Sequence, residues 1–456
     1  MNSSPVTPIP NAKPPAAGWS PFTLFLVLAA VHVPLAYVMR TSPTLGIAHA
    51  LLTGAFGLFL ATMGKNLTAV AGICAYIAGS ELLWRMSGAP IFWEYGKLII
   101  GVILVVTLFR QNLLMRGGLA PAFFLLLLPS AVIPLANVPF EWARQEISFN
   151  LFGPLILALS TWLFRNVAWT RDDMTRVLLF GLLPIVAISI VGVNYIATHE
   201  MTFTDGSNYG TSMGYGPNQV STVLGLGAFI CFLLFTLSPA RSNYLFLAVM
   251  GAGLIGLAAH SAITFSRGGL YSLGAGVLGS LFFLLNTPNA RSRLILAVVA
   301  FVLIGGFYLL PRMNQYTSGA LSHRLQDTKT TGRADLMAAE WELFKAYPVF
   351  GAGPGKIVLL VDTKISHRIA AHTEFTRLIS EHGAFGLAAL VVFVILGIQN
   401  FFRNDTTAGK AISAGLMAWV ILTMFHAAMR LAAPGFIFGL AAAKLLPDNT
   451  TSPRGK

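Results

Sequence analysis

Titratable residues crowd one short stretch of an otherwise apolar sequence. The run AHTEFTRLISEHGAFG contains His372, Glu374, Arg377 and Glu381 and leads directly into a long apolar segment. The three charged residues recur at helical spacing, which predicts an amphipathic helix at the lip of a membrane span. Because His372 lies at the start of that helix, the helix dipole favours a neutral imidazole that can accept a proton. The stretch is a candidate for general-base chemistry, and a histidine held only by packing is the alternative.

Two arginines lie where predicted helices begin or end. Arg267 stands in TFSRGG between two apolar segments, and Arg333 falls in the first turn of a helix predicted from TTGRADLMAAEWELFKAY. A guanidinium group suits an anion because its charge is permanent and its donors are forked. A cation in a first helical turn opposes the helix dipole, and a phosphate bound to the N–H groups of that turn would compensate it. The pair is therefore a candidate phosphate site, and a snorkelling Arg267 with a solvated Arg333 is the alternative.

Other polar residues are weaker candidates. Tyr215 and Asn218 offer a ligand both stacking and hydrogen bonds, although loop turns favour the same residue types. Arg430, beside His426 at the outer end of a late apolar segment, is a further candidate for the anion site. Three charged residues lie in predicted spans, namely Glu81, Glu94 and Lys97, and either Glu81 and Glu94 line a polar cavity or the three form buried ion pairs. The run GAGPGK does not match a nucleotide-binding loop, and Pro354 lacks a donor N–H, so a tight turn is expected there.

The elements that carry these residues are membrane helices. Of the 456 residues, 55% are hydrophobic and 10% charged, where a soluble domain has about a quarter charged. Stretches of about 20 apolar residues recur along the chain, which predicts an all-α polytopic membrane protein with about 12 to 14 transmembrane helices. The predicted spans are 19–39, 43–63, 66–84, 88–109, 118–138, 148–168, 177–196, 219–237, 243–264, 268–286, 294–310, 383–402, 411–427 and a short 431–446.

The distribution of Lys and Arg predicts the orientation of the bundle. With the amino terminus in the cytoplasm, most basic residues of the short connections fall inside, as the positive-inside rule requires. The candidate residues then face outward. We expect a disordered cytoplasmic tail (1–20), a transmembrane bundle (21–310), one large and partly helical outer loop (311–382), C-terminal transmembrane helices (383–446) and a cytoplasmic tail (447–456). Orientation and membrane lipids account for the net charge of +13 without nucleic acid. Cys74 and Cys231 lie in apolar runs and support neither disulfides nor a thiolate metal site.

Three motifs in order resemble a known family. SRGG, TGRADLMAAEWELFKAYPVFGAGPG and AHTEFTRLISEHGAFG, over about residues 260 to 390, resemble the shared region of the O-antigen ligase and O-antigen polymerase superfamily, and GYGPNQVS looks similar to another of its elements. The first half of the chain is similar only in hydropathy. Many members of that family follow the histidine with asparagine, whereas this chain has Thr373, and Glu374 is the nearest residue able to substitute.

The resemblance implies a specific reaction. It implies transfer of a glycan from undecaprenyl diphosphate to an acceptor hydroxyl at the periplasmic face of a bacterial inner membrane, with no metal or other cofactor. Arg267 and Arg333 would hold the diphosphate, and His372 would be the catalytic base of an inverting transfer. Further acceptor or sugar contacts are expected from Glu374, Arg377, Tyr215, Asn218 and Arg430.

Several functions stay open at this point. A ligase would pass the glycan to lipid A core, and a polymerase would pass it to another lipid-linked glycan. One large outer loop favours the ligase, whereas the additional loop at 197–218 favours the polymerase. A transporter or lipid flippase would show internal repeats or charges near the membrane midplane. A structural or sensory membrane protein would tolerate replacement of His372.

Overall fold

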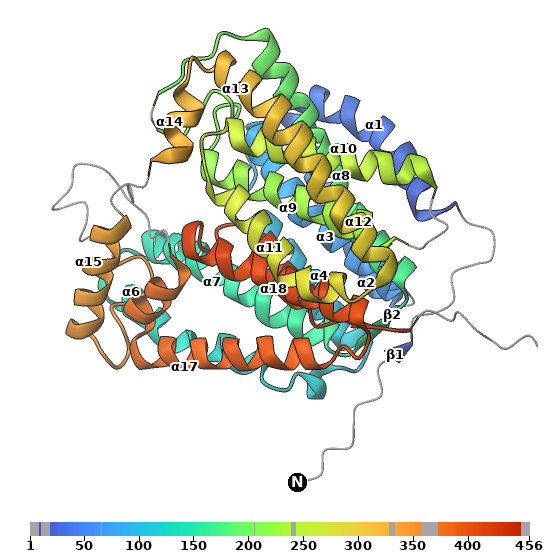
Figure 1. Ribbon diagram of the computed structural model, residues 1–456. Helices are drawn as coiled ribbons and strands as arrows, with labels where there is room; N and C mark the ends of the chain where they lie inside the picture. Colours follow the sequence, from blue (N-terminus) through green and yellow to red (C-terminus); the bar gives the residue numbers. More distant parts are fainter. Residues whose placement is uncertain are drawn as a thin grey trace, which may run out of the picture.

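The computed structural model describes residues 9–10, 19–64, 66–204, 206–238, 243–327, 333–356 and 373–447 (Figure 1). This part of the chain is almost entirely helical, which confirms the all-α polytopic membrane fold. The helices are α1 (Pro21–Thr41), α2 (Pro43–Met63), α3 (Leu67–Met86), α4 (Tyr95–Arg110), α5 (Ala120–Leu125), α6 (Leu128–Asn137), α7 (Phe140–Phe164), α8 (Arg171–Thr198), α9 (Pro217–Leu237), α10 (Tyr244–Ile263), α11 (Gly268–Leu285), α12 (Pro288–Ala300), α13 (Leu310–Tyr316), α14 (Ala320–Gln326), α15 (Arg333–Ala346), α17 (Glu374–Phe402), α18 (Thr407–His426) and α19 (Ala432–Leu440). A 3-10 turn, η1, covers Leu114–Arg116, and a π-helix, η2, covers Phe301–Leu309.

Twelve helical stretches among the described residues are long and apolar enough to cross a membrane. At their centre lies α9, which is buried from Val220 to Leu237 and packs against α8, α10 and α11. Small residues allow the closest approach: a Cβ added to Gly225 would lie 2.3 Å from the carbonyl oxygen of Gly269. Helices in lipid associate largely through such close packing, because lipid offers no hydrophobic driving force between them.

Three short strands mark one end of the bundle, here called the sheet end. β1 (Ile9–Pro10) pairs in parallel with β2 (Val167–Trp169), and β2 pairs in parallel with β3 (Lys444–Leu445). Because β1 precedes the first span and β3 follows the last helix, the chain must cross the bundle an even number of times. The twelve apolar spans, with the shorter α4 and α19, meet that requirement and agree with the predicted 12 to 14. Pairing of Ile9 and Pro10 also differs from the disordered tail expected over 1–20, whose other residues up to 18 lie outside the described part.

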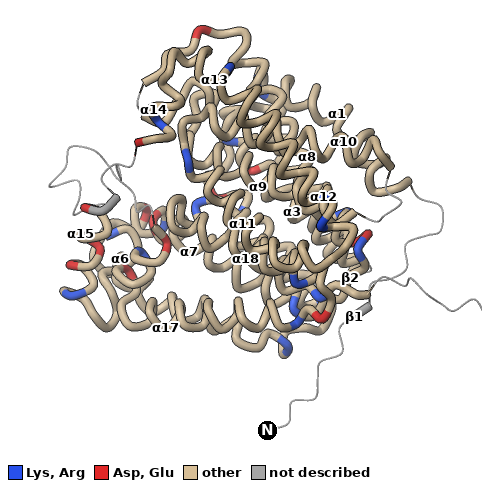
Figure 2. Tube along the Cα trace, viewed as in Figure 1, with Lys and Arg blue, Asp and Glu red and all other residues tan. Residues whose placement is uncertain are grey.

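The connections at the other end, here called the loop end, include residues 87–94, 199–204, 206–216, 264–267 and 317–327. They lie together because Asn208 N–H donates to the Thr264 carbonyl (2.9 Å) and the Tyr316 hydroxyl donates to the Ile196 carbonyl (3.3 Å). Figure 2 shows a mixed group of acidic and basic residues around α15, α6 and the start of α7, while the middle of α17 is uncharged. The charges that the sequence singled out therefore converge on one end of the bundle.

The predicted span 118–138 is observed as the candidate span Ala120–Asn137, which is divided into α5 and α6 because Pro129 lacks a donor N–H. Two other predicted boundaries were wrong. The stretch predicted as 148–168 begins at Phe140, directly after Pro139, because its polar first turns continue the helix beyond the apolar run. The span predicted as 294–310 belongs to a continuous helical stretch from Pro288 to Tyr316. The amphipathic helix predicted to lead into the span from 383 is observed, because α17 starts at Glu374 and a non-helical break at Gly383 (φ 59°) separates its polar turns from the apolar span.

The last short helix begins inside the bundle. α19 has nine residues, against about 20 for a full helical crossing. Its first N–H, on Ala432, donates to the Glu81 carboxylate on α3 (2.7 Å), and beyond its end the carbonyl of Ala443 accepts from Asn404 near the sheet end. Leu431 and Arg430 therefore lie below the loop end, beside the charged residues of α3.

Candidate functional site

Arg267 lies at the turn between α10 and α11, at the loop end. It is half-buried and caps the amino end of α11. Its guanidinium donates to the carbonyl of Asp327, the residue that follows α14. Arg324 binds the same segment, because its Nη1 lies 3.0 Å from the Asp327 carboxylate and its Nε donates to the Phe265 carbonyl (3.1 Å). The turn that carries Arg267 is thus fixed to the segment that leads to α15.

Arg333 is the first residue of α15, as the sequence predicted. The structure describes its place in the helix but not its side chain. Only a short stretch of chain, outside the described residues, separates Arg333 from Asp327, which Arg267 contacts. This places the two candidate arginines on neighbouring segments of the loop end.

A polar group around Asn218 supports the Arg267 turn from the side of α9. The Asn218 side-chain nitrogen donates to the His426 carbonyl (2.7 Å), and its oxygen accepts from Ser266 (3.2 Å) and from His426 Nδ1 (3.2 Å). Since His426 Nδ1 then carries the proton, its Nε2 accepts from Ser272 (2.9 Å). Gly268 is required here, because an added Cβ would lie 2.4 Å from His426 Nδ1. Asn218 thus contacts the protein itself, and its expected sugar contact stays a prediction.

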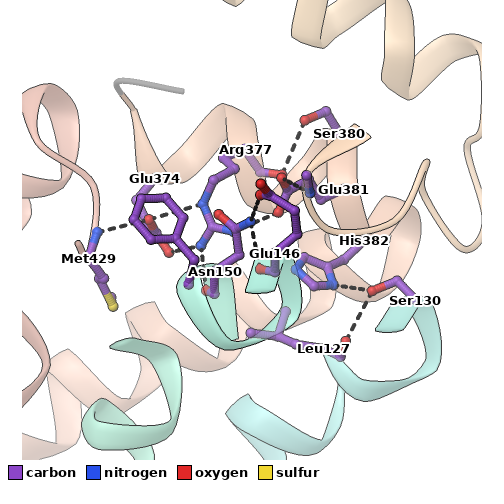
Figure 3. A network of polar contacts seen from close by, with 12 residues as sticks. Leu127, Ser130, Glu146, Asn150, Glu374, Arg377, Ser380, Glu381, His382 and Met429 are labelled. Atoms are coloured by element: carbon purple, nitrogen blue, oxygen red, sulfur yellow. Dashed lines mark hydrogen bonds and ion pairs between the residues drawn. The ribbon is translucent and has the colours of Figure 1, made fainter. Parts of the chain in front are cut away.

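Arg377 is the centre of a buried network on the first turns of α17 (Figure 3). Its guanidinium pairs with Glu374 and with Glu381 (2.6 Å) and donates to the Asn150 carbonyl of α7 (3.2 Å). Burial of such charges is costly unless they are paired and hydrogen-bonded, and here one cation faces two carboxylates. The predicted common face of these three residues is confirmed, but it points into the protein.

The two carboxylates of this network also accept backbone N–H groups from distant segments. Glu374 accepts from Met429 (3.1 Å), and Glu381 accepts from Gly355 (2.9 Å). The first contact fixes the connection that bears Arg430, and the second fixes the turn that follows α15. The network therefore ties three chain segments to the start of α17.

The glycine run after α15 forms the tight turn that the sequence predicted. Gly351, Gly353 and Gly355 have φ values of 73°, 87° and 81°, a region that residues with a Cβ adopt only with strain. The N–H groups of Ala352 and Gly353 donate to the carbonyls of Ser380 and Glu381 (both 3.0 Å). The turn thus docks α15 onto α17.

His372 immediately precedes Thr373, the residue that caps α17. It lies outside the described residues, so its role as a base stays a prediction. Another histidine of the same run, His382, is buried and hydrogen-bonds through Nδ1 to Ser130 on α6. That contact locks α17 against α6 (Figure 3).

Arg85, near the end of α3, joins a second buried group. It pairs with Glu81 (2.5 Å) and donates to the Tyr215 hydroxyl (3.2 Å). Glu94 likewise pairs with Lys97. The alternative of buried ion pairs, open from the sequence for Glu81, Glu94 and Lys97, is the one observed.

Arg430 lies between the two buried groups. Burial lowers the pKa of its guanidinium to about 10, the charge of Arg377 adds to that effect, and Glu374 and Tyr215 oppose it. These electrostatic neighbours place Arg430 beside both the α17 network and Tyr215. It stays cationic at neutral pH, as an anion site requires.

Glu340 on α15 is a carboxyl group that the sequence analysis missed. Its Oε2 accepts from Thr376, which also contacts Thr373, and its Oε1 is buried without a hydrogen-bond partner among the described residues. Burial raises the pKa of Glu340 to about 7. Nothing in the local sequence distinguishes Glu340 from the other acidic residues of this amphipathic helix.

This pKa predicts a pH-dependent stability. The folded state keeps the Glu340 proton up to about pH 7, whereas an unfolded glutamic acid loses it near pH 4.5. The free energy of unfolding should therefore fall between these pH values, by roughly 3 kcal/mol at most, and stay level above pH 7. In Glu340→Gln the amide oxygen still accepts from Thr376, so thermal unfolding should lose this pH dependence. Glu342→Gln, at an exposed position of the same helix, is the control and should keep it. An unchanged profile in Glu340→Gln would contradict the prediction.

Comparison with known protein families matches the part of the chain that carries some of these groups and not the others. Residues 252–391 match a protein-family model described as O-antigen ligase. The matched segment includes Arg267, Arg333, Arg377 and position 372, whereas Arg85 and Tyr215 lie outside it. This confirms the resemblance that the three motifs indicated. No curated protein and no solved structure matches the chain.

Proposed function

Since residues 252–391 carry the O-antigen ligase domain, we propose that this protein is an inverting glycosyltransferase of the bacterial inner membrane. It transfers a glycan from undecaprenyl diphosphate to an acceptor hydroxyl at the periplasmic face, and as a ligase it uses lipid A core as the acceptor. The observation that carries the proposal is the convergence at the loop end. The Arg267 turn, the start of α15 with Arg333 and the start of α17 after His372 all lie there.

The reaction needs little from the protein beyond charge stabilisation and one base. The acceptor oxygen bonds to the anomeric carbon while the bond from that carbon to the diphosphate oxygen breaks. Arg267 and Arg333 stabilise the departing diphosphate, and His372 takes the proton of the acceptor hydroxyl. A single displacement without a covalent enzyme intermediate inverts the anomeric carbon.

The buried network of Arg377 serves this chemistry as a scaffold. It fixes the first turns of α17, directly after His372, relative to the Gly355 turn and the Met429 connection. Catalytic groups must be held close to a productive geometry, and rotamers locked by buried hydrogen bonds achieve this.

Replacement of His372 tests the proposal. With purified protein in detergent, a lipid-diphosphate-linked glycan and lipid A core acceptor, His372→Ala should lower the transfer rate by about 10²–10⁴-fold, the usual contribution of a general base. His323→Ala, at an exposed position on α14, is the control and should transfer normally.

The product masses separate the two members of the superfamily. One added glycan per acceptor supports the ligase, and a ladder of repeat units made without lipid A core supports a polymerase. Equal transfer by wild type and His372→Ala would refute the role of His372, and no transfer with any acceptor would refute the proposed function.

A further inference from the structure

The connection between α3 and α4 presents an indole ring at the loop end. Trp93 is 51% exposed although two residues of the second buried group contact it. The Arg85 guanidinium carbon lies 4.4 Å from the centre of the indole, and the Tyr215 ring centre lies 6.1 Å away. Because the guanidinium covers one face of the ring, the exposed surface belongs to the opposite face and the edges.

The support behind this indole is rigid. Arg85 donates to the Trp93 carbonyl (3.0 Å) as well as to Glu81, and the second oxygen of Glu81 accepts from Ala432 N–H (2.7 Å). Arg85 and Glu81 are almost completely buried. A chain of hydrogen bonds thus runs from the Trp93 carbonyl through Arg85 and Glu81 to the Ala432 N–H. Because this chain holds the residues behind the ring, binding of a ligand to the ring costs little conformational entropy.

Tyr215 adds a directed hydrogen-bond donor. Arginine can only donate, so in the contact between Arg85 and Tyr215 the phenol oxygen is the acceptor. The hydrogen of the phenol is then left for another partner, and no acceptor for it is found among the described residues. The Arg85 Nε, which is buried, also has no hydrogen-bond partner there.

We propose that Trp93, Tyr215 and Arg85 form a subsite for a sugar ring of the glycan substrate. The C–H face of a pyranose stacks on the free face of the indole, and a ring hydroxyl accepts the Tyr215 hydrogen. An apolar surface beside a few fixed polar groups is the usual composition of a small-molecule site. The inference rests on the proposed function for the identity of the glycan as substrate.

The position of the subsite agrees with this assignment. Tyr215 and Asn218 are three residues apart, so their Cα atoms lie within about 11 Å of one another. Asn218 contacts Ser266, the neighbour of Arg267. The distance from the subsite to the turn that is proposed to hold the diphosphate is therefore no more than the length of a few sugar rings.

An anchor in the lipid interface is the competing explanation for an exposed tryptophan at a helix end. Such an anchor needs only the ring and its N–H group at the lipid headgroups. It does not account for an ion pair held behind the ring or for a neighbouring phenol whose hydrogen has no acceptor among the described residues. These two features favour a sugar.

The test uses Trp93→Ala, Trp93→Phe and the control Trp19→Ala, which removes a comparably exposed tryptophan (58%) outside the loop end. In the transfer assay, Trp93→Ala should raise KM for a glycan substrate about tenfold and change kcat less than about threefold. Trp93→Phe should bring KM most of the way back to the wild-type value. Trp19→Ala should match wild type. Unchanged KM in Trp93→Ala, or a loss confined to kcat, would overturn the subsite.

A second measurement separates failure of the subsite from failure of the proposed function. Saturation-transfer NMR with the free oligosaccharide, without lipid or diphosphate, reports binding even if no transfer is found. Signal in the wild type that is lost in Trp93→Ala and kept in Trp93→Phe supports the subsite. Equal signal in wild type and Trp93→Ala, no signal in wild type, or a defect only in thermal stability would overturn it in favour of an interface anchor.

Discussion

Arg377→Met is expected to destabilise the protein by about 3–5 kcal/mol, because it leaves Glu374 and Glu381 buried without their cation. Globular proteins have a total stability of about 5–15 kcal/mol, so a loss of this size removes a large part of the stability and should lower the unfolding temperature strongly. Thermal unfolding followed by fluorescence-detected size exclusion measures it. Transfer activity should be lost with the fold.

Two further variants test whether unpaired buried charge causes the destabilisation in Arg377→Met. Lys345→Met removes a cation from an exposed ion pair with Glu342 on α15, and its effect should stay below about 1 kcal/mol. The combined variant Arg377→Met, Glu374→Gln, Glu381→Gln removes the unpaired charges and should regain part of the lost stability. If Arg377→Met unfolds at the wild-type temperature, the network does not hold α17.

Arg267→Ala and Arg333→Ala are each expected to lower glycan transfer by about 10²–10³-fold with little change in folding. In the proposed mechanism each variant removes donors that stabilise charge on the leaving diphosphate, and loss of one such donor typically has this effect. Arg→Lys should restore little at either position, since an ammonium group does not reproduce the fork of the guanidinium. Transfer rates in detergent, with saturating acceptor and varied donor, measure the effect.

Arg312→Ala is the matched control for these variants. Arg312 is exposed on α13 and contacts the Tyr308 ring, so its loss should leave transfer unchanged. Normal transfer by both Arg267→Ala and Arg333→Ala would remove the diphosphate assignment. A loss of transfer accompanied by an equal loss of folded protein would show that these arginines act on the fold.

Local patterns predicted the start of α15 and the common face of Glu374, Arg377 and Glu381. Both depend on residues a few positions apart, for which helical period and dipole rules are sufficient. The same rules did not reveal that this face points into the protein. Whether a charged face meets water or a buried partner depends on what packs against it.

Span boundaries show the same difference between what local patterns predict and what depends on tertiary packing. The apolar run within α7 is clear in the sequence, but the helix already begins at Phe140, in polar turns that a hydropathy pattern does not count as part of a span. The Asn150 carbonyl accepts from Arg377 more than 200 positions away. A hydropathy pattern weighs each residue by itself and therefore placed this span at 148–168, too late at both ends of α7 (Phe140–Phe164).

The sequence by itself determined the membrane fold and the approximate number of spans, and it supplied the candidate residues for binding a diphosphate and accepting a proton. These follow from composition, from helical period and from motifs in a fixed order, all of which are local or additive properties. Only the tertiary structure decided which charged residues are buried in ion pairs and which distant segments they hold together. Trp93 meets Tyr215, Glu374 meets Met429, and Glu81 meets Ala432, because helices distant in sequence pack together and buried charges must find their partners there.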